Sequence, residues 1–412
     1  MSIPAGPSRH HLGRNRLMSV DPLRGFAMVL VVLQHSYLNV NMTLIPPLLD
    51  WLVWRVTHLA PIAFVSIAGA MFSYYLYLQS DWRAAYRRFA VRAAFILLVA
   101  HYGIGLTSYY SRVVRVPVPP WAHAFGSYVS GMVSDPIAPW VRVLLERYVL
   151  DVGITDLIGI SLLVSPVLIL GVGPVVRAVI IAVMLVGSPV VVGFVHPAGT
   201  AGLILKEALF GSVGEPSMFW YPLVPWIAIF VTGSFAGQAL ARFKQGSLDA
   251  ATLIQKTTTA GIALAAPTLG YEMLRLGFGH HVGPDFYRAL YPSHVTVLLP
   301  AYFAVLAWLF AFFMQRIDVA GTYHRPTWAL SILGRTSLFA YVVQFAVVLS
   351  APAVLGLTGS IGSAGFALLF VVGLAVVWLL CYAYGRLRGW FTKDDYEQCA
   401  AAARARQQAS HV

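Results

Sequence analysis

Apolar runs of about twenty residues recur along the whole sequence and are separated by polar segments. A helix needs roughly 20 apolar residues to cross the hydrocarbon core of a bilayer. Of the 412 residues, 58% are hydrophobic and 11% are charged, whereas soluble domains carry about 25% charged residues. The pattern therefore predicts an all-α polytopic membrane protein.

We expect a bundle of about ten transmembrane helices. The first twenty residues would form a cytoplasmic N-terminal segment, residues 21–390 the transmembrane domain, and residues 391–412 a cytoplasmic tail. The predicted spans are residues 23–41, 57–78, 93–110, 149–170, 175–195, 219–240, 257–278, 294–314, 331–354 and 362–384.

The basic residues support this division, because loops on the cytoplasmic side of a membrane carry an excess of Lys and Arg. With ten spans, the basic patches fall mainly on the side that carries both termini. These patches are the N-terminal segment, the segment from Arg83 to Arg92, Arg177, residues 242–256, residues 316–325 and the C-terminal tail. Both termini are therefore expected in the cytoplasm, and topology explains the net charge of +12 without a nucleic-acid partner.

The first span is an apolar run that carries four polar side chains. Asp21 and Arg24 stand at its start, and Gln34 and His35 lie near its end. Fourteen residues separate Asp21 from His35, which is roughly 21 Å of helix. Ionisable groups in a membrane helix are costly and mark functional sites. Two other interpretations remain open: Asp21 and Arg24 at spacing i,i+3 suit a local ion pair, and a membrane histidine often only joins helices by a hydrogen bond.

Further polar residues are expected at the outer level of the bundle, where they would line a chamber. Asp156 stands near the start of the fourth span and His294 at the start of the eighth, while His101 and Gln344 are expected deeper. A neutral, partly desolvated His35 could act there as a general base toward a hydroxyl or an amine, or as a nucleophile that carries an acyl group. Two cysteines in 412 residues predict no disulfide framework and no cysteine metal site.

Several segments of the sequence are similar, in order, to motifs of a known superfamily. The segment V-D-P-L-R-G-F-A-M-V-L-V-V-L-Q-H has an acid, then Leu-Arg-Gly, then a His. Others are A-F-V-S-I-A-G, R-R-F-A-V-R-A-A-F, D-V-G-I-T-D-L-I-G, Y-P-L-V-P-W, L-Y-P-S-H and L-G-R-T-S-L-F-A-Y-V-V-Q. Together they resemble the transmembrane acyltransferase superfamily, and most of all its heparan-alpha-glucosaminide N-acetyltransferase-like branch.

The resemblance implies an integral-membrane acyltransferase. It would move an acyl group, expected to be acetyl, from cytoplasmic acyl-CoA to a hydroxyl or amine of an extracytoplasmic sugar or glycan. Such a protein would sit among lipids in a bacterial inner membrane, with acyl-CoA as co-substrate and no metal, and a homo-oligomer is left open. Carried over by position, the essential His of the family falls on His35. Gln344 stands where the ninth-span segment of the family often ends in His.

We expect the following roles for the residues so far singled out. His35 is the catalytic candidate. Asp21, Arg24, Arg88 and Arg92 would bind the CoA donor at the cytoplasmic side, and Asp156, Trp226 and His294 would bind the acceptor. A secondary transporter of a small solute is an alternative function, although we detect no internal repeat of the kind transporters show. A non-catalytic membrane scaffold is another, but it gives no reason for Asp21, Arg24 and His35 to share one helix.

Overall fold

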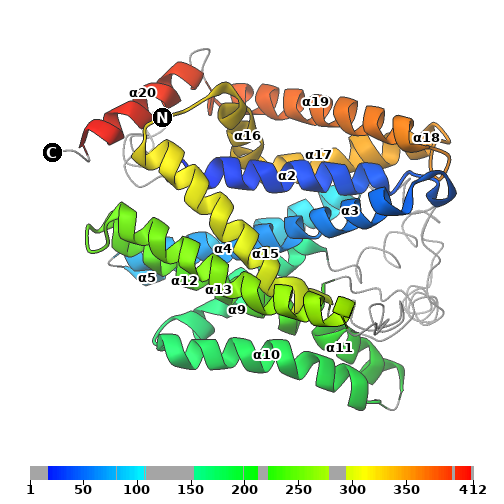
Figure 1. Ribbon diagram of the computed structural model, residues 1–412, viewed down its shortest axis with the longest axis horizontal. Helices are drawn as coiled ribbons and strands as arrows, with labels where there is room; N and C mark the ends of the chain where they lie inside the picture. Colours follow the sequence, from blue (N-terminus) through cyan, green and yellow to red (C-terminus); the bar gives the residue numbers. More distant parts are fainter. Residues whose placement is uncertain are drawn as a thin grey trace, which may run out of the picture.

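The computed structural model describes residues 17–79, 81–105, 107, 153–197, 199–211, 221–277, 294–391 and 395–409. Across these residues the chain is all-helical, and its only β-type pairing is an isolated bridge between Val40 and Ile361 (Figure 1). The α-helices are α2 (Val20–Tyr37), α3 (Pro47–Thr57), α4 (Leu59–Leu78), α5 (Trp82–Phe95), α9 (Ile154–Ile169), α10 (Pro174–Phe194), α11 (Thr200–Phe210), α12 (Leu223–Lys244), α13 (Ala250–Gly277), α15 (His294–Phe313), α16 (Arg325–Arg335), α17 (Ser337–Gln344), α18 (Ala351–Val354), α19 (Ser363–Leu387) and α20 (Asp395–Ala409). The short 3-10 helix η1 is Met42–Leu44, and the π-helices are η2 (Ile96–Ala100), η3 (Met314–Val319) and η4 (Phe345–Ser350).

Seven helices within the described residues are long and apolar enough to cross a membrane. They are Pro47–Leu78, Trp82–Gly105, Pro174–Phe194, Leu223–Lys244, Leu299–Val319, Ser337–Val354 and Ser363–Leu387, and α9 is a shorter apolar helix. The all-helical membrane class is thus confirmed. Every predicted span overlaps a helix, but ten crossings and cytoplasmic termini stay predictions. The first span, α2, is not among the seven because its charged and polar side chains lower its hydropathy.

The basic segment from Arg83 to Arg92 is not a loop, as the sequence analysis expected, but the first half of a long helix. Asp81 caps this helix, since its carboxylate accepts hydrogen bonds from the Arg83 and Ala84 N–H groups at 2.9 and 3.1 Å. Such caps satisfy N–H groups that have no partner inside a helix. Four alanines and no glycine follow the cap within α5 before Ala94, and this composition favours helix over loop.

Other boundaries also differ from those predicted. The helix α3 precedes the second predicted span, α11 lies in the connection before residue 219, and α20 forms within the predicted tail. The predicted ninth span, residues 331–354, is divided at Thr336 into α16 and α17. The Thr336 hydroxyl donates to the Ile332 carbonyl at 2.8 Å, which closes the last turn of α16 before α17 begins.

Helix α2 lies against α16, and two glycines bring their backbones together. A Cβ on Gly25 would lie 1.8 Å from the Leu330 carbonyl oxygen, and a Cβ on Gly334 would lie 1.8 Å from the Asp21 carbonyl oxygen. Small residues at such contacts let membrane helices approach closely. The glycines of the Leu-Arg-Gly and Leu-Gly-Arg motifs are therefore each required by the same helix contact.

Helices α4 and α12 form an equally close pair. Cβ atoms on Gly69, Gly233 and Gly237 would lie 1.9 to 2.0 Å from backbone carbonyl oxygens of the facing helix. The spacing of Gly233 and Gly237 is the G-x-x-x-G pattern of membrane helix pairs. The glycine that ends the A-F-V-S-I-A-G motif thus serves packing, and α2 and α4 together form the centre of the bundle.

One basic residue that the sequence placed at the cytoplasmic surface is buried instead. The Arg177 side chain is 1% exposed. Its guanidinium donates to the Ser234 hydroxyl at 3.0 Å and to the Val172 carbonyl just beyond the end of α9 at 3.1 Å, and it lies 5.0 Å from the Phe235 ring centre. Carbonyls at a helix C-terminus carry partial negative charge. Arg177 thus packs between helices, and the side of the membrane on which it lies stays a prediction.

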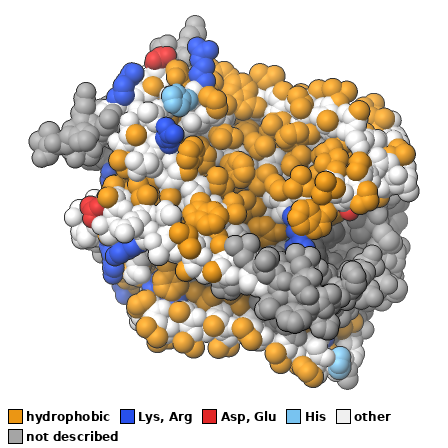
Figure 2. All heavy atoms as spheres, viewed as in Figure 1, with side chains coloured by type: hydrophobic (Ala, Val, Ile, Leu, Met, Phe, Trp, Pro, Cys, Tyr) orange, Lys and Arg blue, Asp and Glu red, His pale blue; other side chains and the backbone are white. Residues whose placement is uncertain are grey.

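The surface has the distribution of a membrane protein. Valines of α10 and aliphatic residues of α19 are exposed, namely Val175, Val176, Val179, Val183, Val186, Val190, Leu368, Val371, Val372, Leu379 and Leu380. Figure 2 shows a broad hydrophobic face, with Lys and Arg side chains gathered mainly at the end of the bundle near α20. Apolar side chains at the surface in this number indicate a lipid-facing belt.

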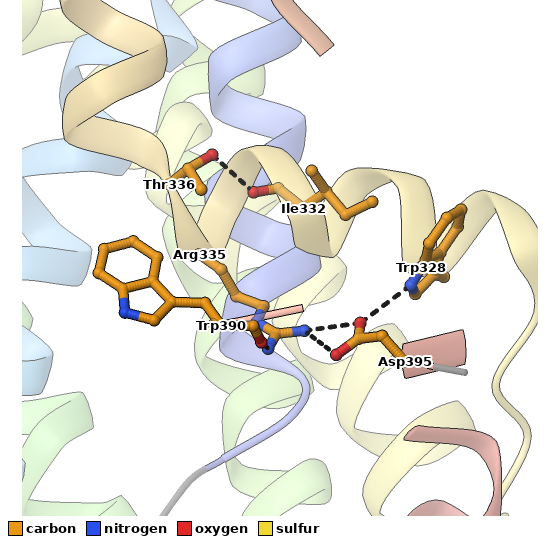
Figure 3. A network of polar contacts seen from close by, with 6 residues as sticks. All are labelled: Trp328, Ile332, Arg335, Thr336, Trp390 and Asp395. Carbon is orange, nitrogen blue, oxygen red and sulfur yellow. Dashed lines mark hydrogen bonds and ion pairs between the residues drawn. The ribbon is translucent and has the colours of Figure 1, made fainter. Parts of the chain in front are cut away.

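Helix α20 is held at the same end of the bundle as the start of α2 by a buried polar network (Figures 1 and 3). Arg335 Nη1 donates to the two Asp395 carboxylate oxygens at 3.0 and 2.8 Å, and Nη2 donates to the Trp390 carbonyl at 2.6 Å. Trp328 Nε1 donates to Asp395 at 3.1 Å. The Arg335 guanidinium also lies 4.3 Å from the Phe391 ring centre. The motif arginine thus anchors the C-terminal helix.

Candidate active site around His35

His35 lies in the last turn of α2, and its ring is oriented by Gln344 at the end of α17. The His35 Nδ1 atom is 2.7 Å from Gln344 Oε1. Gln344 Nε2 donates to the Tyr341 carbonyl at 3.1 Å. This second hydrogen bond orients the amide so that its oxygen faces His35. An amide oxygen only accepts hydrogen bonds, so Nδ1 carries the proton and Nε2 carries the lone pair of the neutral ring. This is the tautomer a general base requires.

The surroundings of His35 tie α2 to the π-helix η4. The His35 and Phe345 ring centres are 4.8 Å apart. Asn39 Nδ2 donates to the Val348 carbonyl at 2.7 Å and to the His35 carbonyl at 3.2 Å. A π-helix frees backbone groups and often occurs at functional sites. The end of α2 is therefore held on η4 by both the Asn39 amide and the His35 ring.

A second histidine is paired with a carboxylate on the neighbouring helices. His101 Nδ1 is 3.0 Å from Asp156 Oδ2, and the two side chains are 17% and 8% exposed. The same carboxylate oxygen accepts from the Gly153 N–H at 2.9 Å, which caps the N-terminus of α9. Asp156 Oδ1 is buried, and none of the described residues donates a hydrogen bond to it. His101 directly follows η2, so a π-helix adjoins each of the two histidine pairs.

The two pairs belong to one region of the bundle. A Cβ on Gly103 would lie 3.6 Å from the Val342 side chain, and Ile104 shares a hydrophobic cluster with Phe345 and Leu349. The Ser350 hydroxyl donates to the Thr107 carbonyl. The helix that carries His101 therefore runs along α17 and η4, which carry the partner of His35. Gln344 does not lie deeper than His35, as the sequence analysis expected, but in contact with it.

At the other end of α2, Asp21 and Arg24 are half-buried. The Ser19 N–H donates to Asp318 at 3.2 Å. Burial raises the pKa of the Tyr323 phenol, and the Asp21 carboxylate contributes a smaller upward shift of that pKa. This end of α2 thus faces the segment between η3 and α16.

The other predicted donor-side residues do not join this group. Arg88 and Arg92 are exposed on α5, and Arg88 donates to the Gln79 side chain. Helices α2 and α5 each pack against α4, which separates the two groups. Asp21 and Arg24 thus lie on a different helix from Arg88 and Arg92, and the roles of all four residues toward the donor stay predictions.

The predicted acceptor residues are placed unequally. Asp156 belongs to the histidine pair described above. The Trp226 side chain is 4% exposed, meets the Tyr221 ring edge-on at 4.9 Å, and has an indole N–H for which none of the described residues is an acceptor. Its ring and its N–H are therefore both covered by the protein. His294 begins α15, but its side chain lies outside the described residues.

No group of three His, Cys, Asp or Glu residues in the described part of the chain is arranged to hold a metal ion. Cys381 is buried and Cys399 is half-buried, and neither forms a disulfide within the described residues. The polar groups of the candidate site are thus imidazole, carboxylate and amide groups, which suit proton transfer.

A comparison with protein families shows the family of this chain. The model of the heparan-alpha-glucosaminide N-acetyltransferase catalytic domain matches residues 16–269. The chain belongs to this family. The matched residues include α2 with His35 and the His101–Asp156 pair, and end within α13. No curated protein and no solved structure matches the chain. Membership confirms the resemblance seen in the sequence and identifies an integral-membrane transferase of the acetyltransferase type.

Sequence reasoning missed two features of this heparan-alpha-glucosaminide N-acetyltransferase-like site. His101 was noted only as a deep polar residue, although an ionisable side chain in an apolar helix is costly and marks a functional site. Gln344 was set aside because it is not a histidine. Its distance of 309 residues from His35 along the chain leaves no local pattern that could have joined them.

Proposed function

We propose that the chain transfers an acyl group, expected to be acetyl, from cytoplasmic acyl-CoA to a hydroxyl or amine of an extracytoplasmic sugar, with His35 as the general base. One observation carries this proposal: the hydrogen bond between His35 Nδ1 and Gln344 Oε1. It sets the tautomer in which Nε2 can accept a proton. Family membership supplies the reaction class.

The chemistry follows from that tautomer. Nε2 of His35 takes the proton from the acceptor as its oxygen or nitrogen attacks the thioester carbonyl, and the C–S bond to CoA then breaks. A positioned histidine base accelerates such a step by about 10²- to 10⁴-fold. The apolar walls that Phe345 and its neighbours provide would keep water from the thioester.

The donor is proposed to enter at the end of α2 that carries Asp21 and Arg24. An arginine fork suits CoA phosphates, and the pantetheine arm would cover much of the roughly 16 Å of helix between Arg24 and His35. Arg88 and Arg92 are exposed on α5, so their proposed role is to attract the anionic donor to the surface. The proposal includes ten crossings and both termini in the cytoplasm of a bacterial inner membrane.

The acceptor is proposed to bind near Asp156 and Trp226. The unpartnered Asp156 oxygen can accept from a sugar hydroxyl or amine, and the Trp226 N–H can donate to a sugar oxygen. His294 stays a proposed acceptor residue on its position alone.

The direct test is release of CoA thiol from acetyl-CoA by the purified protein in the presence of a panel of glycans and amino sugars. We expect release that depends on the acceptor, with acetylated sugar as the second product. Accumulation of a solute in sealed vesicles without any need for acetyl-CoA, together with no thiol release, would support a transporter and refute the proposal.

A further inference from the structure

We propose that the His101–Asp156 pair is a second proton-transfer centre of the site, in which His101 protonates the departing CoA thiolate while His35 takes the proton of the acceptor. This inference rests on the proposed function and assigns a role that the family match does not assign. It begins from a contrast between the partners of the two histidines.

The partner of His35 is a neutral amide, and the partner of His101 is a carboxylate. Both partners accept a hydrogen bond from Nδ1, so in each ring Nε2 is the nitrogen turned away from the partner. An ionised carboxylate stabilises an imidazolium, whereas an amide oxygen mainly orients the ring. Two like groups in unlike environments usually divide the acid and base roles. His35 is thus suited to accept a proton and His101 to donate one.

The position of the pair agrees with a shared reaction site. His101 and Gln344 are each next to a π-helix, η2 and η4, and the turn that follows His101 packs at Gly103 against Val342 of α17. Phe345, which contacts the His35 ring, belongs to the same cluster as Ile104, one turn beyond His101. The His101 side chain keeps some exposure, at 17%. The geometry therefore places both rings at the same end of the bundle.

The carboxylate is also less satisfied than a purely structural cap would be. Asp156 Oδ2 holds both the Gly153 N–H and His101, while the buried Oδ1 has no donor among the described residues. A buried acceptor without a donor destabilises the folded state. If Asp156 only capped α9 and His101 only packed against it, the buried Oδ1 without a donor would serve no purpose.

The proposed step is balanced in atoms and charge. The acceptor oxygen forms a bond to the carbonyl carbon, and its proton passes to His35 Nε2. The C–S bond breaks, and the sulfur electron pair takes the proton from His101 Nε2, which leaves a neutral imidazole beside Asp156. The products are the acetyl ester and CoA thiol. Each histidine then returns to its starting state by exchanging one proton with solvent.

The test varies the leaving group. Purified wild-type protein and His101→Gln are given two acetyl donors, S-acetyl-pantetheine and S-phenyl thioacetate, with the same sugar acceptor. The aryl thiolate leaves without a proton. We expect His101→Gln to slow transfer from the pantetheine donor by about 100-fold, but transfer from the phenyl donor by less than about 5-fold. The pH profile of kcat/KM for the pantetheine donor should also lose its alkaline limb.

Three comparisons keep the result interpretable. His35→Gln should slow both donors equally, and His196→Gln, an exposed histidine outside the site, should change neither. Asp156→Asn should lose more transfer with the pantetheine donor than with the phenyl donor, as His101→Gln does, beyond the loss from weaker acceptor binding that is common to both donors. This second variant keeps the test valid if His101→Gln misfolds. Equal losses with both donors in folded His101→Gln and Asp156→Asn, or no loss, would overturn this inference alone. If the wild-type protein acetylates no acceptor from either donor or from acetyl-CoA, the proposed function fails and the inference with it.

Discussion

Replacing Asp395 with Asn removes the charge that holds α20 on α16. The wild-type carboxylate accepts two hydrogen bonds from Arg335 at 3.0 and 2.8 Å and one from Trp328 at 3.1 Å. Both side chains of the ion pair are largely buried, at 12% and 8% exposure. The substitution therefore leaves a guanidinium whose remaining partners are the Trp390 carbonyl and the Phe391 ring.

The expected loss can be worked from this geometry. Two unit charges 2.8 Å apart attract each other by about 6 kcal/mol at an effective dielectric constant of 20. Part of this is offset by the cost of taking both charges out of water, and breaking a buried pair typically costs about 3–5 kcal/mol. Asparagine keeps a neutral acceptor, so we expect about 3 kcal/mol, which is roughly 100-fold in the undocking equilibrium of α20.

Hydrogen–deuterium exchange of the α20 amides measures that equilibrium. We expect exchange in Asp395→Asn to be about 100-fold faster than in the wild type, because amides of α20 exchange through the undocked state. Glu397→Gln makes the same chemical change two residues away at an exposed position and should leave exchange within about 2-fold. Equal exchange in the two variants would refute the reasoning that this ion pair docks α20.

Three further predictions test other contacts. Gly69→Val should destabilise the detergent-solubilised protein by at least about 1–3 kcal/mol, because its side chain would meet a carbonyl of α12, whereas Gly187→Val, in open space, should leave the melting temperature nearly unchanged. Gln344→Leu removes the group that orients His35, so it should reduce acetyl transfer by about 100-fold. The melting temperature should fall by no more than a few degrees. Unchanged transfer would show that the hydrogen bond is not needed. Asp81→Ala should increase amide exchange in the first turn of α5 by about 5-fold, the effect of losing a cap worth about 1 kcal/mol, and an unaltered first turn would contradict the assigned cap.

The sequence predicted the membrane class and the location of the helices because both depend on local hydropathy. It also indicated the first span as the site-bearing helix, since four polar residues in one apolar run are visible without a structure. What it predicted poorly were helix starts. The arginines of residues 83–92 suggested a loop, whereas a single Asp81 cap and a run of good helix formers extend the helix through them.

The remaining features depend on contacts between residues far apart in the chain. Gln344 meets His35 across 309 residues, and Asp156 meets His101 across 55. Arg177 follows a Gly-Pro turn and was counted as a surface charge, because hydropathy alone does not show that the end of α9 and Ser234 surround it. The motif glycines were recognised by pattern, but the helix contacts that require them appear only in three dimensions.

The most direct test of the central claim is acceptor-dependent release of CoA thiol by His35→Ala, measured beside the wild type and His196→Ala. The account predicts that His35→Ala loses at least about 100-fold in kcat while it remains folded and inserted in the membrane. His196→Ala, which changes an exposed histidine, should match the wild type. Wild-type turnover by folded His35→Ala would contradict the assignment of His35 as the base.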